Sequence, residues 1–126
     1  MSLENIEAIS AQMEVYFDAL YHADSARLRT VFHPKLAYVC ATEGDELYLD
    51  LETYMARVDQ RIPAAQNGEA RADRVLEISQ GGDRLAHVKA QMTLMGRDYL
   101  DYLTFVRHDG GWRLVAKVFS YIPMES

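Results

Sequence analysis

Hydrophobic and polar positions along the chain repeat with two different periods, which separate helical from extended segments. Between residues 3 and 22, apolar side chains recur at helical spacing and acidic ones fall mostly on the other side. Between residues 84 and 95, apolar and polar side chains alternate, which is typical of a strand with one covered face. The apolar set of this strand is Ala86, Val88, Ala90, Met92 and Leu94.

Three helices are predicted in the first half of the chain, each beginning after a residue that can cap it. The side chains of Ser2, Asp24 and Asp50 can accept hydrogen bonds from the first free backbone amides. We expect the second helix to end at His33, because Pro34 favours extended geometry in the residue before it. The third helix is expected to bury a face made of Leu51, Tyr54, Met55, Val58 and Ile62.

Six strands are predicted from runs of Tyr, Val and alternating residues that are separated by Gly-rich turns. They are expected at 36–42, 46–49, 69–79, 84–95, 99–107 and 112–121. Long neighbouring strands joined by tight turns predict antiparallel pairing. Helices grouped against one face of such a sheet define an α+β domain.

Two segments carry a more specific pattern. Residues Tyr16–Pro34 read YFDALYHADSARLRTVFHP, and residues Asp101–Phe119 read DYLTFVRHDGGWRLVAKVF. With the element order, they resemble the nuclear-transport-factor-2-like superfamily, and within it the putative lumazine-binding group beside the SnoaL-like cyclases. The resemblance implies one domain over residues 1–126: a cone-shaped curved antiparallel sheet packed on three helices around a cavity, called a cystatin-like α+β roll. It also implies a dimer through the outer face of the sheet.

Composition fits one soluble domain and narrows its partners. The chain has 126 residues, of which 49% are hydrophobic and 25% charged. A chain of this length and composition can form a hydrophobic core without disulfide bonds or structural metal ions. Its net charge of −6 and its dispersed Lys and Arg residues disfavour nucleic-acid binding. No apolar run approaches the roughly 18 residues of a membrane span, and the acidic start is unlike a signal peptide. With the single cysteine Cys40, we expect a cytoplasmic protein.

Ketosteroid isomerases of the superfamily combine a Tyr, a protonated Asp and an Asp base. Aligned without gaps, these positions fall at Tyr16, near Leu103 and at Cys40, so one of three residue types is kept. Steroid-type isomerisation is therefore disfavoured. Cys40 is expected to be a small core residue.

Cyclases and dehydratases of the SnoaL-like kind need an Asp or His base inside the cavity, and Asp101 and His33 are the candidates. Asp101 stands among aromatic and aliphatic residues, where burial would make it a better base. The alternative that we favour is a structural pair of Asp101 with Lys117 on the next strand, because a buried charge normally needs such a partner. Such a pair could still line the pocket and orient a polar ligand. For His33, a contact with the last carbonyls of a helix is favoured over catalysis.

Tyrosines suggest the nature of a ligand. Six of the eight are expected around the cavity: Tyr16, Tyr38, Tyr54, Tyr99, Tyr102 and Tyr121. An apolar wall with polar tips suits a flat or aromatic molecule, and simple core filling is the equal alternative. The expected ligand-binding residues are Tyr16, Tyr38, Tyr54, Tyr99, Asp101, Lys117 and Phe119.

Two functions stay open. The four histidines lack metal-ligand spacing, and the chain has no phosphate loop, dinucleotide fingerprint or nucleophile elbow, so we expect neither metal nor cofactor. A domain that binds a small molecule is slightly favoured. The alternative is a cofactor-free cyclase, isomerase or dehydratase that uses Asp101 and Tyr16, with Lys117 or His33 as electrostatic helper. The outward set of the alternating strand predicts a homodimer through the sheet, in which a partner satisfies His87, Lys89 and Gln91.

Overall fold

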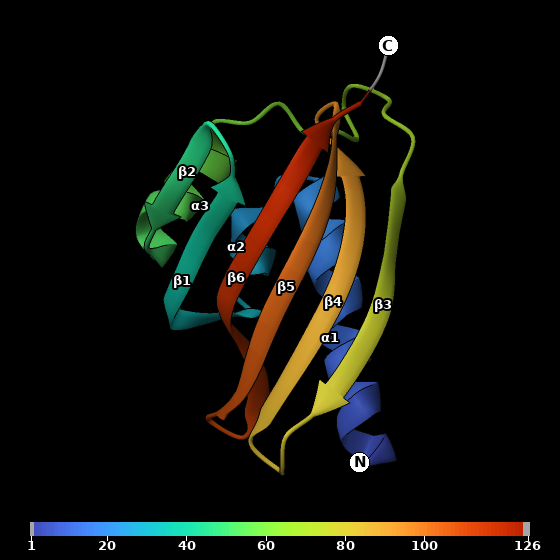
Figure 1. Ribbon diagram of the computed structural model, residues 1–126, viewed down its shortest axis with the longest axis vertical. Coiled ribbons are helices and arrows are strands. Elements are labelled where there is room, and N and C mark those ends of the chain that lie inside the picture. The colour runs from blue at the N-terminus through green and yellow to red at the C-terminus, as the bar shows by residue number, and fades with distance from the viewer. Residues whose placement is uncertain (1, 125–126) are drawn as a thin grey trace.

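Three helices lie on one face of a six-stranded sheet in the computed structural model, which describes residues 2–124 (Figure 1). The helices are α1 (Leu3–Tyr21), α2 (Ser25–Leu28) and α3 (Leu51–Asp59). The strands are β1 (Phe32–Thr42), β2 (Asp45–Leu49), β3 (Ala72–Gln80), β4 (Leu85–Leu94), β5 (Arg97–His108) and β6 (Gly111–Pro123). The expected α+β class is confirmed. Within residues 2–124, no helix is both long and apolar enough to cross a membrane.

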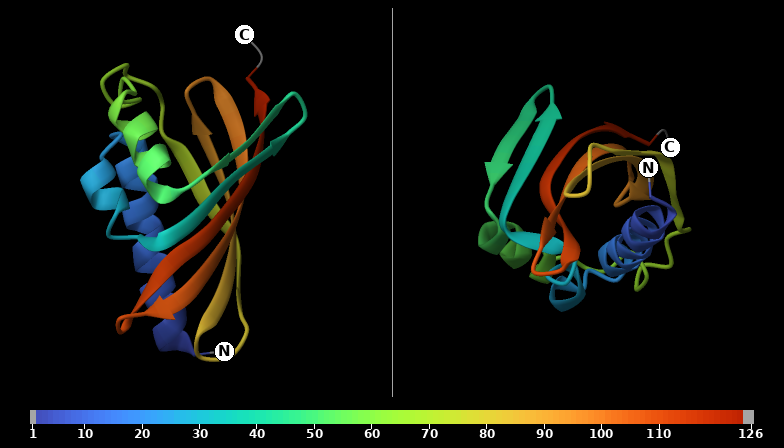
Figure 2. Two further views of the ribbon diagram at one scale, coloured as in Figure 1. Left: turned by 90° about the vertical axis from the view of Figure 1, so that its left-hand side faces the viewer. Right: turned by 90° about the horizontal axis from the view of Figure 1, so that it is seen from below.

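The strands follow the order β2-β1-β6-β5-β4-β3 across the sheet. Strands joined by tight turns pair antiparallel, as the turns predicted. The expectation of a wholly antiparallel sheet was wrong at one place: β1 and β6, which most of the chain separates, pair in parallel. Seen from below, β3 to β6 curl around α1, and the β1–β2 hairpin extends to the side beside α3 (Figure 2).

The predicted caps are confirmed at all three helices. The backbone amide of Asn5 donates to the hydroxyl of Ser2 at 3.3 Å, and that of Arg27 donates to the carboxylate of Asp24 at 3.2 Å. Asp50 caps α3 in the same way: the backbone amide of Thr53, the third helical residue, donates to the Asp50 carboxylate at 2.9 Å. Short polar side chains therefore set where each helix begins.

The end of α2 differs from the expectation, because the helix stops five residues before His33. Strand β1 begins at Phe32, which lies opposite Leu114 of β6. The amide of Leu114 donates to the carbonyl of Val31 over 2.8 Å. A β-branched and an aromatic residue directly before the X-Pro step favour a strand over another helical turn.

The end of α3 also comes earlier than expected. The helix ends at Asp59, so Ile62 lies beyond it and is 62% exposed instead of buried. The other four residues of the predicted face are buried: Leu51, Tyr54, Met55 and Val58.

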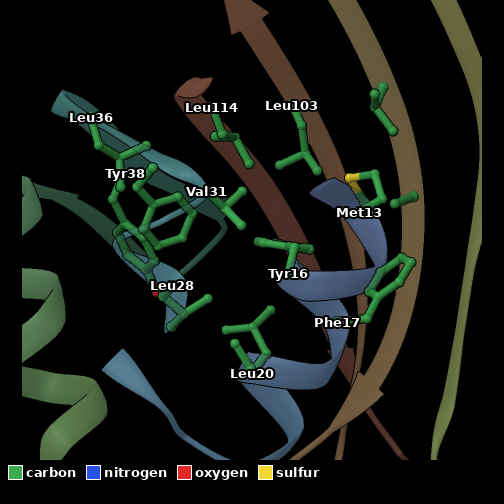
Figure 3. Close-up of a cluster of buried hydrophobic side chains, with 14 of the residues drawn as sticks. Met13, Tyr16, Phe17, Leu20, Leu28, Val31, Leu36, Tyr38, Leu103 and Leu114 are labelled. Carbon is green, nitrogen blue, oxygen red and sulfur yellow. The ribbon is translucent and has the colours of Figure 1, made fainter. Parts of the chain in front are cut away.

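The core lies between α1 and the concave face of the sheet. Met13 and Tyr16 are fully buried, and Figure 3 shows them on the side of α1 that faces Leu103 of β5 and Leu114 of β6. On β4, the alternation is confirmed: all five apolar residues predicted to face inward are buried, and the residues between them are not.

Polar contacts fasten α1 to the end of the sheet near the β5–β6 turn. The side-chain amide of Gln12 donates to the carbonyl of Trp112 over 2.7 Å. The guanidinium of Arg107 donates to the side-chain oxygen of the buried Asn5 over 2.8 Å. These bonds hold the first turns of α1 against β5 and β6.

Candidate functional site

Strands β5 and β6 place two charged side chains on the covered face of the sheet. In their antiparallel register, Asp101 lies opposite Phe119, and Leu103 lies opposite Lys117. Side chains alternate between the faces of a strand, so these four share one face. Asp101 is 2% exposed and Lys117 is 5% exposed. A carboxylate and an ammonium are therefore buried side by side on two neighbouring strands.

The carboxylate of Asp101 is held by Tyr16 of α1. The Tyr16 hydroxyl donates to Oδ2 of Asp101 over 2.6 Å, the length of a hydrogen bond to an ionised group. Burial and the negative charge of Asp101 raise the pKa of Tyr16 well above its usual value, so the phenol stays protonated and remains a donor. The other oxygen, Oδ1, is buried and has no hydrogen-bond partner within residues 2–124.

Lys117 is surrounded by aromatic side chains. Its ammonium donates to the Tyr54 hydroxyl over 3.2 Å and lies 5.0 Å from the centre of the Tyr16 ring. Burial by itself lowers the pKa of Lys117, but Tyr16, Tyr54 and Asp101 outweigh it and raise the pKa well above its usual value. The side chain therefore stays a cation, which suits the faces of aromatic rings.

The expected direct pair of Asp101 and Lys117 is not formed. Within the described chain, no hydrogen bond and no ion pair of 4.0 Å or less joins these two side chains. Tyr16 occupies one carboxylate oxygen, and Tyr54 accepts from the ammonium. The two charges still act on each other across a short gap, because Asp101 is among the groups that raise the pKa of Lys117.

A small cavity, here called the inner chamber, lies beside these groups. Its volume is about 20 Å³, enough for roughly one water molecule or one hydroxyl group. It is lined by Leu20, Tyr38, Tyr54, Arg61, Met92, Leu94, Met95, Tyr99, Asp101, Lys117 and Phe119. The side chains of Asp101 and Lys117 thus both line one cavity.

A wider hollow, here called the vestibule, adjoins the inner chamber. Its volume is about 590 Å³, within the range of small-molecule sites, which is roughly 300–1,000 Å³. It is lined by Tyr38, Cys40, Asp45, Leu47, Thr53, Ala56, Arg57, Gln60, Arg61, Met95, Arg97, Tyr99, Phe119 and Tyr121. Five of these residues also line the inner chamber, so the chamber is the inner end of the vestibule.

Aromatic rings form the walls where the two spaces meet. The ring centres of Tyr38 and Phe119 are 5.0 Å apart, and those of Tyr99 and Tyr121 are 5.6 Å apart. Burial raises the pKa of Tyr38 to about 12, so its hydroxyl stays a donor at neutral pH. The expectation for Tyr102 was wrong: this side chain lies on the outward face of β5 and is 43% exposed.

The structure brings together most of the expected site residues, but not His33. His33 lies on β1 outside both spaces, where its ring is 4.4 Å from that of His108 and its Nδ1 accepts from the amide of Lys35 over 2.9 Å. The expected contact of His33 with helix carbonyls is also wrong, because α2 ends at Leu28. His22 makes such a contact at the end of α1, with Nδ1 at 2.9 Å from a helix carbonyl.

The positions compared with the ketosteroid isomerases have ordinary environments. Leu103 is a fully buried core residue, and Cys40 is a buried residue in the vestibule wall. The carboxylate beside Tyr16 is Asp101, two residues before Leu103. In the part of the chain that the structure describes, no three His, Cys, Asp or Glu side chains are placed to hold a metal ion.

Sequence reasoning missed three arginines of the vestibule. Arg57 and Arg61 stand four residues apart where α3 ends, and Arg97 begins β5. Their positions at the ends of two elements were the signal available in the sequence. They bring positive charge to the mouth of the site.

Comparison with known proteins identifies the family. The model of the family described as putative lumazine-binding matches residues 4–120. The chain belongs to this family. No protein with a curated description matches the chain.

Solved structures similar to this member of the putative lumazine-binding family share its fold. An NTF-2-like protein of unknown function from Silicibacter pomeroyi has a TM-score of 0.80 and 24% identity, over 97% of this chain and 100% of that one. A protein of unknown function from Pectobacterium atrosepticum has a TM-score of 0.74 and 28% identity, over 96% and 93%. A cystatin-like fold protein from Burkholderia xenovorans has a TM-score of 0.75 and 19% identity, over 98% and 96%. The expected superfamily and the cystatin-like α+β fold are confirmed.

Proposed function

We propose that this chain binds a small, flat organic molecule in the vestibule and that one polar group of the molecule enters the inner chamber. The observation that carries the proposal is the buried Oδ1 of Asp101, which has no hydrogen-bond partner within residues 2–124 and belongs to a side chain that lines that chamber. An unpaired buried acceptor costs free energy, so a ligand group that donates to it recovers that cost. The chamber has room for about one such group.

The two charged groups of the chamber select the chemistry of the polar group. Oδ1 of Asp101 needs a donor, and Lys117 has donors beyond the one that Tyr54 accepts. A hydroxyl can donate to the first and accept from the second. An ether oxygen accepts only, so it would leave Oδ1 unpaired. The walls of Tyr38, Tyr99 and Phe119 suit a flat ring behind this group.

The test compares two rings that differ in this one group. We expect 2-naphthol to bind at least about fivefold more tightly than 2-methoxynaphthalene, because leaving a buried acceptor unpaired costs about 1–3 kcal/mol. The fluorescence of the naphthalene ring, followed as protein is added, gives both dissociation constants. Lumazine is titrated in the same way, because the description of the family names it. Asp101→Asn should remove most of the preference, and Asp83→Asn, at an exposed turn, should keep it. The proposal fails if none of these rings binds, or if Asp101→Asn leaves the preference intact.

The same free oxygen favours a second function, a cofactor-free cyclase, isomerase or dehydratase of the SnoaL-like kind. Asp101 would accept a proton from an acidic carbon of the ligand through Oδ1, while Tyr16 holds the carboxylate in place through Oδ2. A suitable substrate for a test is 2-tetralone in D₂O, whose exchange of acidic C–H protons is followed by NMR. Exchange faster than with Asp101→Asn would support proton transfer. Equal exchange rates with the wild type and with Asp101→Asn would indicate a domain that binds the molecule without proton transfer.

A further inference from the structure

The vestibule wall contains three arginines, Arg57, Arg61 and Arg97, that form no ion pair within residues 2–124. Among those described residues, Asp45 is the one carboxylate in the vestibule wall, and it accepts a hydrogen bond from the Tyr121 hydroxyl at 2.5 Å. In the described part of the chain, the three arginines therefore line the space without an ion-pair partner, and Asp45 acts only through its charge, on Arg97.

Aromatic rings hold two of these groups in place. The guanidinium carbon of Arg97 lies 4.1 Å from the centre of the Tyr121 ring, and one of its nitrogens is 3.4 Å from the Tyr99 hydroxyl. The guanidinium carbon of Arg61 lies 5.7 Å from the centre of the Tyr54 ring. A guanidinium stacked on a ring keeps its N–H donors at the edge, where a carboxylate can accept two of them in parallel.

The charge of the vestibule contrasts with that of the whole chain. The net charge is −6, so most of the surface repels anions. The walls of the vestibule and inner chamber carry four cations, including Lys117, against the carboxylates of Asp45 and Asp101. Local positive charge in an acidic protein points to a ligand that is itself negative.

We propose that the ligand is a flat aromatic carboxylate. Its carboxylate lies among Arg57, Arg61 and Arg97 in the vestibule, and a hydroxyl at its other end reaches Asp101 in the inner chamber. This inference rests on the proposed function, because it adds a charged group to a molecule that the aromatic walls already bind.

The test uses 6-hydroxy-2-naphthoate and its uncharged methyl ester, which share the ring and the hydroxyl. We expect the acid to bind about tenfold more tightly than the ester at low salt, with the advantage shrinking as salt screens the charges. Arg61→Gln and Arg97→Gln should each weaken binding of the acid by up to about fivefold, the range of partly exposed ion pairs, and weaken binding of the ester less. The control is Arg84→Gln, an exposed arginine outside the vestibule, which should change neither.

The outcomes separate this inference from the function on which it rests. If the ester binds as tightly as the acid, or if the arginine variants weaken both equally, the anionic ligand is overturned and the binding of flat rings survives. If neither the acid, the ester nor 2-naphthol binds, the proposed function itself is overturned. Circular dichroism of each variant shows whether it keeps the native fold, and a variant that loses it is replaced by Arg→Lys at the same position, which keeps the charge but not the planar fork.

Discussion

Replacing Lys117 by Met tests how strongly the two buried charges of the inner chamber depend on each other. Met keeps a long apolar side chain and removes the cation. Asp101, which is 2% exposed, would then keep the Tyr16 hydroxyl as its hydrogen-bond donor without a nearby positive charge. Removing one partner of a buried ionic pair destabilises proteins by about 3–5 kcal/mol. We expect a loss of that size in the free energy of unfolding at pH 7.

A double-mutant cycle isolates the coupling between the two charges. Asp101→Leu should also cost about 3–5 kcal/mol, because it leaves a buried ammonium without its carboxylate. The double variant has no buried charge and leaves the hydroxyls of Tyr16 and Tyr54 unpaired, at a cost of about 1–3 kcal/mol each. From the middle of each range, the coupling free energy should be about 4 kcal/mol, even though no direct bond joins Asp101 and Lys117.

Urea unfolding, followed by Trp fluorescence and far-ultraviolet circular dichroism, gives the four free energies. Lys89→Met is the matched control, because this lysine is half-buried on the outward face of β4 and its ammonium lies 5.6 Å from an aromatic ring centre. It should cost less than about 1 kcal/mol. The reasoning is refuted if the two single losses add to within about 0.5 kcal/mol in the double variant, as they do at independent sites.

Three further predictions concern the tyrosines and the outer sheet face. Tyr16→Phe should lower the free energy of unfolding by about 1–3 kcal/mol, since it leaves a buried carboxylate without its donor, whereas Tyr102→Phe should change it by less than about 0.5 kcal/mol in the same urea titration. In the folded state, the pKa values of Tyr38, at about 12, and of Lys117 lie above their ordinary values. Their contribution to the free energy of unfolding is therefore complete below about pH 10 and should be lost as the pH rises toward 12. Urea midpoints that stay constant from pH 9 to 12 would contradict this. We expect a homodimer through the outward face of the sheet, where Tyr102 of β5 lies opposite Lys89 of β4, so light scattering should show Tyr102→Glu as a monomer and Tyr48→Glu, on the edge strand β2, as a dimer; a monomeric wild type at micromolar concentration would refute the dimer.

Features set by neighbours in the sequence could be predicted. The caps at Ser2, Asp24 and Asp50 depend on one side chain and an amide three residues later, so they can be recognised without knowing the fold. The alternation in β4 likewise depends on the pleat of a single strand. The end of α2 was mistaken because pairing with Leu114 of β6, a long-range contact, decides where β1 begins.

The partners of the site residues could not be predicted. Cross-strand reasoning correctly placed Asp101 and Lys117 on neighbouring strands and therefore suggested a direct pair. The structure gives Asp101 a partner 85 residues away, Tyr16, because the curl of the sheet around α1 brings the helix within reach of β5. Arg61 escaped notice for the same reason: its relation to the inner chamber depends on where α3 lies over the sheet, which no local pattern encodes.

The two ends of the domain tolerate amino-acid substitution to different degrees. The bonds of Gln12 and Asn5 fasten α1 at the end near the β5–β6 turn, away from the vestibule. Thr53 and Ala56 of α3 and Gln60 at its C-terminal cap, in contrast, are exposed and line the vestibule. Exposed positions tolerate substitution with little effect on stability. A library at these three positions should therefore alter ligand preference while the fold survives, which makes the domain a scaffold on which new binding specificities can evolve or be selected.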